Sequence, residues 1–503
     1  MKRSFSVAVL AIAGVTAVAP AWGRDRDAGF ARAWGDRFQS SAAAADDRAR
    51  PTRPPVGLVA WIRHWNQIAI DASGLDHTPV APGESRVFGE QLGPGRSSRA
   101  MAIVHVAIFE VVNAMAPKYQ SLVGLKRSPG GTSKRAAIAQ AAHDTLVALY
   151  PSQATAFDQA LADELGEIRD GKSKSRGVEL GRRAASAVLA LRAGDHSDEA
   201  DPRMGEDYVP GDAPGVWRQD PISQVPIALG AHWGEVRPLV IPSGDAFRVP
   251  PPPALDSAEY AAAYDEVKRL GAEASTERTD DQTLAGIYWA YDGMPSLCAP
   301  PRLYNLMTVH IAEQMRTPAV ELARLLALVN VAMADAGIAV WESKYHYAFW
   351  RPITGIRESD PGTGPTGAGD GNPATIGDPS FVPLGAQTTN LTGPNFTPPF
   401  PAYPSGHAGF GGALFQTLRR FYRRDDVRFT FVSEELNGVT VDNNGHVRPL
   451  APRTFSSFSQ AEEENGQSRI YLGIHWAFDK TEGIAQGRQV ADYVFDHAFA
   501  PAR

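Results

Sequence analysis

Three separated segments of the chain concentrate basic side chains and histidines. In the first, WESKYHYAFWRP (341–352), Lys344 and Arg351 stand seven residues apart. Seven residues make about two helical turns, which puts both long cations on one helix face, about 10 Å apart. Pro352 disfavours helical geometry at Arg351, so the helix is expected to end there. The pair can converge on one anion, although such a pair more often decorates a solvated face.

The second segment, PAYPSGH (401–407), has the composition of a helix start. If Ser405 is the N-cap, Gly406 and His407 occupy the first turn, where free N–H groups and the helix dipole favour an anion. Glycine lets the anion come close to the backbone, and histidine can exchange a proton near neutral pH. An ordinary capped helix after a proline turn is the alternative interpretation.

The third segment, SRIYLGIHWAFD (468–479), adds Arg469, His475 and Asp479. On a helix, residues four apart are neighbours, so Asp479 can orient the imidazole of His475. A surface arginine and a core histidine would be the simpler interpretation.

Taken together, the segments supply three cations, a helix start and two histidines. This set suits a tetrahedral oxyanion, such as phosphate or its analogue vanadate, better than a carboxylate. One histidine can attack or ligate the central atom while the other moves protons.

The three patterns, in this order, resemble a signature shared by vanadium-dependent haloperoxidases and the type-2 phosphatidic acid phosphatase superfamily. They are Lys344-x6-Arg351-Pro352, Pro404-Ser405-Gly406-His407 and Ser468-Arg469-x5-His475-x3-Asp479. From about residue 57 to the end, the length and helical make-up resemble the chloroperoxidase-type enzymes. The resemblance implies two packed helical bundles in one subunit.

The resemblance also implies a role for each matching residue. His475 would bind vanadium, His407 would be the acid–base partner for the apical oxygen and incoming peroxide, and Asp479 would steady the third segment through Arg469 or His475. The equatorial oxygens of vanadate would be held by Lys344, Arg351, Ser405, the Gly406 N–H and Arg469. Lys344 would also polarise the peroxide.

Vanadate would act as a Lewis acid without a redox change. Hydrogen peroxide and a halide, chloride or bromide, would then give hypohalous acid or a halogenated organic product. Trp341 and Phe400 resemble the aromatic halide-site positions of chloroperoxidase-type members, with core packing as the alternative. Asp292, in Tyr291-Asp292-Gly293, resembles a family residue that contacts the first-segment arginine.

Two other functions compete with the haloperoxidase. In a secreted acid phosphatase of the same superfamily, His475 would form a phosphohistidine and His407 would protonate the leaving group. The chain is about twice the usual length of such phosphatases and lacks the membrane spans of lipid phosphatases. A non-catalytic oxyanion-binding protein would not need His407, His475 and Asp479 as a proton-handling set.

The elements that must position these residues are mainly helices. Apolar residues recur at three- and four-residue spacing in segments near 57–72, 98–116, 133–150, 153–169, 176–193, 257–272, 278–293, 301–316, 318–343, 407–424 and 481–498. Alternation over 428–432 and at 439–441, before an Asp-Asn-Asn-Gly turn, predicts one small β-hairpin. Long Pro- and Gly-rich loops are expected over 197–256 and 353–404. The predicted fold class is all-α, with bundles over 55–300 and 301–503.

Composition and the N-terminal sequence indicate the class of protein and its cellular location. The 503 residues are 43% hydrophobic and 21% charged with a net charge of −7, which is ordinary globular composition without a nucleic-acid footprint. Residues 1–23 have the pattern of a signal peptide and 24–54 that of a disordered lead-in, so a secreted or periplasmic protein without a membrane span after cleavage is expected. The lone Cys298 is expected to be structural.

Overall fold

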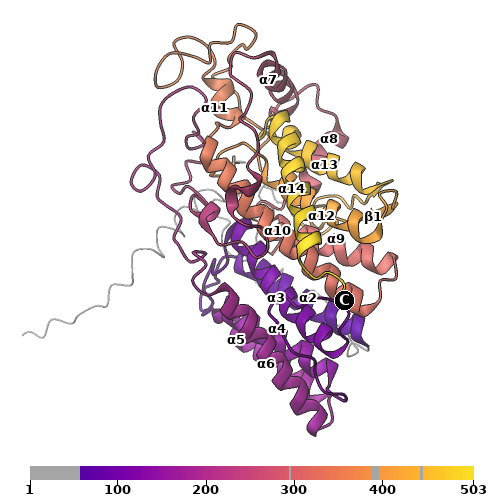
Figure 1. The fold of residues 1–503 in the computed structure, drawn as a ribbon. Helices are drawn as coiled ribbons and strands as arrows, with labels where there is room; N and C mark the ends of the chain where they lie inside the picture. The colour runs from indigo at the N-terminus through magenta and orange to yellow at the C-terminus, as the bar shows by residue number, and fades with distance from the viewer. Residues whose placement is uncertain (1–56, 294–295, 387–395, 442–445, 503) are drawn as a thin grey trace, which may run out of the picture.

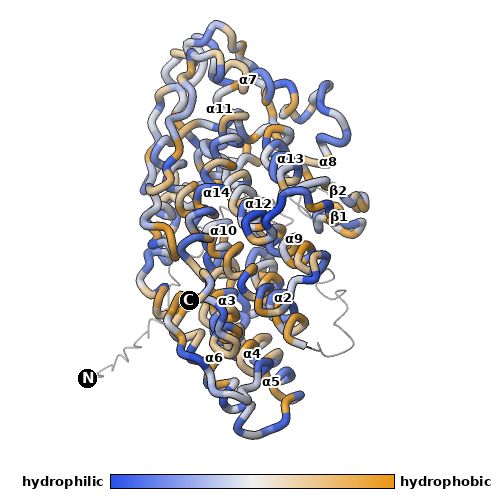
Figure 2. The backbone as a smooth tube through the Cα atoms, turned by 45° about the vertical axis from the view of Figure 1, so that its right-hand side comes forward, coloured by the Kyte–Doolittle hydropathy of each residue, from blue (hydrophilic) through white to orange (hydrophobic). Residues whose placement is uncertain are grey.

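A computed structural model describes residues 57–293, 296–386, 396–441 and 446–502, which fold into a mainly helical protein (Figure 1). The expected signal peptide and lead-in lie outside these residues. The helices of the first half gather at one end of the molecule in Figures 1 and 2. They are α2 (Leu58–Asp76), α3 (Gly93–Met115), α4 (Lys134–Leu149), the 3₁₀ turn η1 (Pro151–Gln153), α5 (Ala154–Gly166) and α6 (Lys172–Arg192).

The rest of the chain supplies the helices that carry the three motifs. After the 3₁₀ turns η2 (Trp233–Glu235) and η3 (Gly244–Phe247), these are α7 (Ala258–Gly271), α8 (Asp280–Tyr288), α9 (Pro300–Gln314), α10 (Ala319–Tyr347), α11 (Pro352–Arg357), α12 (Gly406–Tyr422), the 3₁₀ turn η4 (Glu434–Leu436), α13 (Phe458–Tyr471) and α14 (Ala477–His497). The expected helical fold is confirmed, whereas the bundle boundary near residue 300 stays a prediction.

Helix α10 is the centre of the core. Every residue from 322 to 341 is buried, and the helix packs against α3, α12 and α14. A helix that is apolar on all sides must be enclosed. The buried carboxylate of Asp335 is satisfied by the N–H groups of Leu239, Val240 and Ile241, at 2.7 to 3.0 Å. The helix expected near 318–343 is thus confirmed, and it holds Lys344 near its end.

Two helices, α3 and α10, are long and apolar enough to cross a membrane by length and composition alone. Their most apolar windows are 89% and 100% buried inside the protein. Such burial is typical of the central helices of a core, and Figure 2 shows that most other helices mix hydrophobic and hydrophilic residues.

Glycines set the spacing of α12 and α14. A Cβ on Gly487 would lie 2.0 Å from the carbonyl oxygen of Gly409, and one on Gly412 would lie 2.6 Å from that of Ile484. The two backbones therefore approach closely, which only glycine permits. This contact brings the N-terminal ends of both helices together, where the N–H of Ser405 donates to the carbonyl of Asp479 at 2.9 Å.

The hairpin prediction is partly wrong. Strand β1 (Phe429–Phe431) pairs antiparallel with β2 (Arg453–Phe455), while 439–441 contributes only an isolated bridge between Val441 and Val447. The expected turn at 442–445 lies outside the described residues. The longer connection lets the rings of Phe429 and Phe455 pack 5.2 Å apart, which buries more apolar surface than a local hairpin of Val439 and Val441 offers.

Candidate oxyanion site

The three motifs meet in the interior. Lys344 is fully buried, and Arg351 and Arg469 are each 1% exposed. Helix α10 ends at Tyr347, Ala348 adopts a left-handed conformation (φ 45°), and Arg351 is extended as the N-cap of α11. The helix therefore ends before Pro352, as expected, but a few residues earlier than predicted. Arg351 consequently points inward from a turn and not from a helix face.

The ammonium of Lys344 is held by backbone carbonyls. Its Nζ donates to the carbonyl oxygens of Pro401 and Ala402 at 2.8 and 2.9 Å. Burial, with the charge of Arg351, holds the pKa of Lys344 well below its usual value. Nζ also lies 5.1 Å from the ring centre of Phe400. An anion that binds next to the ammonium of Lys344 stabilises its charged form.

The guanidinium of Arg351 joins the three motifs. Its Nε donates to the carbonyl of Phe400 at 2.9 Å and its Nη1 to that of Ile474 at 2.8 Å. Nη1 also lies 2.9 Å from Nε2 of His475. Burial lowers the pKa of Arg351 to about 9. These contacts fix the plane of the guanidinium against the imidazole.

Arg469, near the end of α13, is paired with a carboxylate from the segment that follows α8. Its Nη2 donates to both carboxylate oxygens of Asp292, at 2.8 and 2.9 Å. Burial raises the pKa of Asp292, and the charge of Arg469 opposes that rise. The expected contact of Asp292 with the first-segment arginine is wrong: its partner is Arg469, because the 290–293 segment follows α8, which packs against α13.

Three guanidinium nitrogens of the two site arginines lack a hydrogen-bond partner among the residues that the structure describes. They are Nη2 of Arg351 and Nε and Nη1 of Arg469, all buried. Buried donors normally find acceptors, so unused donors at one place indicate a missing acceptor. Among the described residues, the carboxylates that interact with Lys344, Arg351 and Arg469 are those of Asp292 and Asp479. The residues fit a bound oxyanion with several oxygens.

His475 is oriented from both sides. Its Nδ1 donates to Oδ2 of Asp479 at 2.8 Å, which leaves the Nε2 lone pair facing Arg351. Burial and the neighbouring cations, Arg351 first, hold the pKa of His475 well below its usual value. Helix α14 begins at Ala477, so His475 lies just before it, yet the expected pairing with Asp479 is present. A neutral imidazole whose Nε2 carries a lone pair suits a metal ligand or a nucleophile.

Asp479 also organises the start of α14. Its Oδ2 accepts from the N–H of Trp476 at 3.0 Å. Burial raises the pKa of Asp479 to about 7, although the Trp476 hydrogen bond and the charge of Lys344 oppose that rise. Of the two partners proposed for Asp479, the structure selects His475.

The second motif caps a helix as predicted. Ser405 is the N-cap of α12, and its Oγ accepts from the N–H of Ala408 at 3.4 Å. Nε2 of His407 donates to the carbonyl of Ala290 at 2.6 Å, so Nδ1 is its basic nitrogen. Burial, with the charge of Arg469, holds the pKa of His407 well below its usual value. Neutral His407 can therefore accept a proton.

A partly open cavity leads to these groups. It includes about 590 Å³ of space between atoms and is lined at its polar end by Gly406, His407, Arg469, His475 and Asp292. Trp341 and Phe400 line the same cavity with ring centres 4.9 Å apart. The role of these two aromatic residues as a halide site stays a prediction.

Two kinds of functional group in the site could not be recognised from sequence motifs. The first is the set of backbone carbonyls that hold the cations and His407, from Ala290, Phe400, Pro401, Ala402 and Ile474. The second is the far wall of the cavity, which includes His77, Leu92 and Leu229 from the first half of the chain. Backbone acceptors and apolar wall residues have no distinctive local pattern.

Cys298 contacts the wall of this cavity, because its Sγ lies 3.9 Å from Nε2 of His77. Cys298 is buried and lies 2.9 Å from Oγ of Ser73, which agrees with a structural role. His346 and His446 are exposed, as expected.

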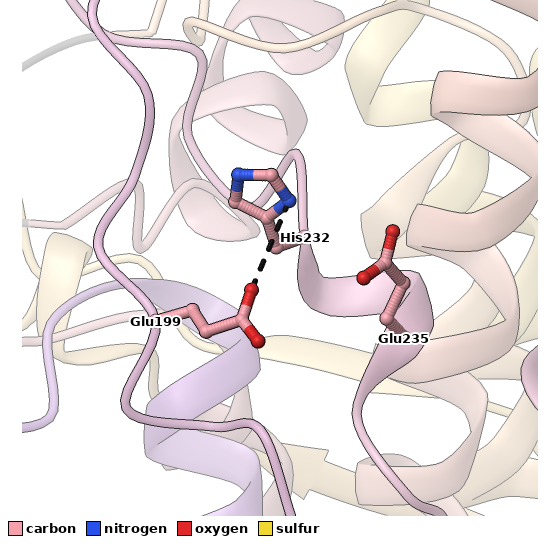
Figure 3. Close-up of side chains that lie close together, drawn as sticks. All are labelled: Glu199, His232 and Glu235. Carbon is pink, nitrogen blue, oxygen red and sulfur yellow. Dashed lines mark ion pairs between the residues drawn. The ribbon is translucent and has the colours of Figure 1, made fainter. Parts of the chain in front are cut away.

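A surface group of metal-ligand type joins Glu199, His232 and Glu235, with ligand atoms within 4.8 Å of one another (Figure 3). Nδ1 of His232 lies 4.0 Å from Glu199, and the group is partly or fully exposed. This arrangement is what a surface ion pair requires.

Comparisons with known proteins agree with this geometry. A family model described as the second helical-bundle domain of VCPO matches residues 324–502. The chain is 32% identical over 502 residues to the vanadium chloroperoxidase of Curvularia inaequalis, across 83% of this chain and 79% of that one.

Two solved bacterial structures share the fold. A vanadium-dependent iodoperoxidase is 22% identical with a TM-score of 0.69, over 90% of this chain and all of that one. An apo-type vanadium-dependent chloroperoxidase is 17% identical with a TM-score of 0.60, over 81% and 94%. The Curvularia relative, which is similar over most of both chains, shows that this chain belongs to the vanadium-dependent haloperoxidases of the chloroperoxidase type.

Proposed function

We propose that this haloperoxidase binds vanadate at the meeting point of the three motifs and oxidises chloride or bromide with hydrogen peroxide. The observation that carries the proposal is the group of three unpartnered guanidinium nitrogens beside the lone pair of His475. An enclosed, positively charged site of this kind requires a multiply charged oxyanion.

The residues divide the work of holding vanadate. His475 Nε2 is the nitrogen available to bind the metal, because Asp479 occupies Nδ1. The free guanidinium donors, the Lys344 ammonium and the N–H of Gly406 are the groups available to its oxygens. When bound, vanadate supplies Lewis-acid activation of hydrogen peroxide.

His407 handles protons. Its Nε2 is tied to the carbonyl of Ala290, so a proton from hydrogen peroxide goes to Nδ1. The carboxylate of Asp292, with Oδ1 at 3.8 Å from Nε2, stabilises the imidazolium that forms. Lys344, from the first motif, polarises the peroxide oxygens. Trp341 and Phe400 exclude water from the halide.

The test uses apo-protein prepared by chelation. Added orthovanadate should restore bromide-dependent halogenation with hydrogen peroxide, and excess phosphate should suppress it because both oxyanions need the same donors. Vanadate binding is followed separately by ⁵¹V NMR. Halogenation that does not depend on vanadate would contradict the proposal, and phosphoester hydrolysis inhibited by vanadate, without halogenation, would favour the phosphatase.

We also propose that the protein is exported after cleavage near residue 23. The basic Lys2 and Arg3, the apolar run from Val7 to Val18 and the small residues before Arg24 support this. Mass spectrometry of the protein from culture supernatant and periplasm tests it. An intact N-terminus on protein that stays in the cytoplasm would contradict it.

A further inference from the structure

The peptide unit between Ala290 and Tyr291 lies between His407 and a carboxylate outside the three motifs. Its carbonyl oxygen accepts from Nε2 of His407 at 2.6 Å, and its N–H donates to Oε1 of Glu435 at 3.0 Å. A trans peptide is planar, so its C=O and N–H point in opposite directions and turn together. A group that holds the N–H therefore also sets the direction of the carbonyl that His407 contacts.

The carboxylate of Glu435, in the 3₁₀ turn η4, is fully buried. Its second oxygen, Oε2, forms an ion pair with Nη1 of Arg448, which is 5% exposed. The N–H of Tyr291 therefore makes a charge-assisted hydrogen bond to a paired anion. Hydrogen bonds in a chain polarise one another, so this anion makes the Ala290 carbonyl a stronger acceptor for His407.

The two residues before Glu435 hold the same turn. Oγ of Ser433 donates to the carbonyl of Tyr288 at 2.7 Å, and the N–H of Glu434 donates to the hydroxyl oxygen of Tyr291 at 2.8 Å. Tyr291 has a left-handed backbone (φ 44°), which a bulky residue adopts only where its surroundings enforce it. These hydrogen bonds, with that of the Tyr291 N–H, hold the turn in this conformation.

We propose that Glu435 is a positioning residue for His407 and acts through the Ala290–Tyr291 peptide. By holding the N–H, Glu435 keeps the carbonyl directed at Nε2 of His407, so Nε2 carries the hydrogen and Nδ1 keeps the lone pair. This rests on the proposed function, in which Nδ1 takes a proton from hydrogen peroxide. Without Glu435, the peptide is free to turn, and His407 then populates the other tautomer as well.

The first test reads the tautomer without turnover. Vanadate-free protein labelled with ¹⁵N at histidine should show, for His407, a protonated Nε2 and an unprotonated Nδ1. The His407 signals are assigned by their loss in His407→Gln. A protonated Nδ1 with an unprotonated Nε2 in the wild-type protein would overturn the inference, and this measurement does not depend on the folding of a Glu435 variant.

The second test compares two variants that differ in one hydrogen-bond acceptor. Both carry Arg448→Met, so that no unpaired guanidinium stays buried. Glu435→Gln keeps an oxygen for the Tyr291 N–H and should retain the His407 tautomer, with kcat for halogenation within about threefold of wild type. Glu435→Leu removes that oxygen and should give a mixture of tautomers and a kcat about tenfold lower, since loss of one hydrogen bond changes such an equilibrium by about that factor.

Glu110→Leu is the matched control. Glu110, in α3, is also fully buried and accepts from a main-chain N–H, that of Leu122, at 2.6 Å, but it does not line the cavity. This variant should lose stability yet keep the wild-type tautomer of His407 and the wild-type kcat.

Equal tautomer populations and equal kcat in the glutamine and leucine variants would overturn the inference. Absence of vanadate-dependent halogenation in the wild-type protein would instead contradict the proposed function. The two failures are distinct, because the tautomer of His407 is measured in vanadate-free protein.

Discussion

Nδ1 of His475 donates to Oδ2 of Asp479 at 2.8 Å, and both side chains are buried. The carboxylate fixes the tautomer that leaves Nε2 with a lone pair. Asp479→Asn should therefore weaken vanadate binding about 10- to 100-fold, as loss of such an orienting partner usually does. Equilibrium dialysis with vanadate measures this without turnover. Equal affinity in Asp479→Asn and wild type would show that vanadate binding does not depend on the Asp479 carboxylate.

The ion pair between Arg469 and Asp292 is buried on both sides, at 1% and 7% exposure of the side chains. Arg469→Met leaves the Asp292 carboxylate without its cation and should cost about 3 to 5 kcal/mol of unfolding free energy. The double variant Arg469→Met, Asp292→Asn should recover part of that loss because the unpaired charge is gone. Urea unfolding of the wild type, Arg469→Met, Asp292→Asn and the double variant gives the coupling energy. A coupling near zero would contradict the pairing.

Bound oxyanion should stabilise the folded protein. Three buried cations face two carboxylates, so vanadate or phosphate relieves unbalanced positive charge. At 100 times its dissociation constant, a ligand that binds only the folded state adds about 2.7 kcal/mol. Thermal unfolding of the apo-protein with and without orthovanadate checks this. Lys344→Met should show a smaller shift, and equal shifts in both proteins would exclude Lys344 from the site.

Gly406 lies against Trp341. A Cβ at this position would come within 3.1 Å of two carbons of the indole ring. Gly406→Ala should displace the ring or the start of α12, and we expect about a tenfold loss in halogenation rate. Gly166→Ala, where the added Cβ meets nothing within 4 Å, is the matched control and should retain the rate. Full activity of Gly406→Ala would mean that this close approach is dispensable.

His105, in α3, should make stability fall in acid. Burial lowers its folded-state pKa to about 3, whereas the unfolded chain titrates near 6.5. Between pH 6.5 and pH 3, His105 is therefore mostly protonated in the unfolded state and mostly neutral in the folded state. The stabilisation is complete above that pH and is lost progressively as the pH falls toward 3.

For this residue alone, about 2 kcal/mol should disappear between pH 7.5 and pH 5. His105→Gln, which keeps an acceptor for Nδ2 of Asn305, should show a shallower decline. Urea unfolding at both pH values measures the difference, with exposed His346→Gln as control. A decline as steep in His105→Gln as in wild type would assign the acid sensitivity elsewhere.

The sequence predicts the helices with strong apolar periodicity and the three motifs, because those depend on local spacing. It predicts the Ser405 cap for the same reason. Apolar periodicity does not mark the short α11 or the polar α13, and α13 packs against α12, α14 and α8. The pairing of β1 with β2 spans residues 429 to 455 and depends on which phenylalanine rings meet.

The partner of Asp292 was also beyond local inference. Which of three arginines a carboxylate meets depends on how α8 packs against α13, and this is not encoded in the motif itself. Similarly, the carbonyls that bind Lys344 carry no residue-specific signal. The residue types thus predict the chemistry of the site. The groups that hold these residues in place become known only from the three-dimensional structure.

The contacts of Ala290 with His407 and of Asp292 with Arg469 have a consequence for engineering. An isolated fragment that begins at residue 301 would keep all three motifs yet lose the carbonyl that fixes one histidine's tautomer and the counter-ion of one arginine. Transplanting the motifs onto another scaffold would therefore have to carry the Ala290–Asp292 turn with them.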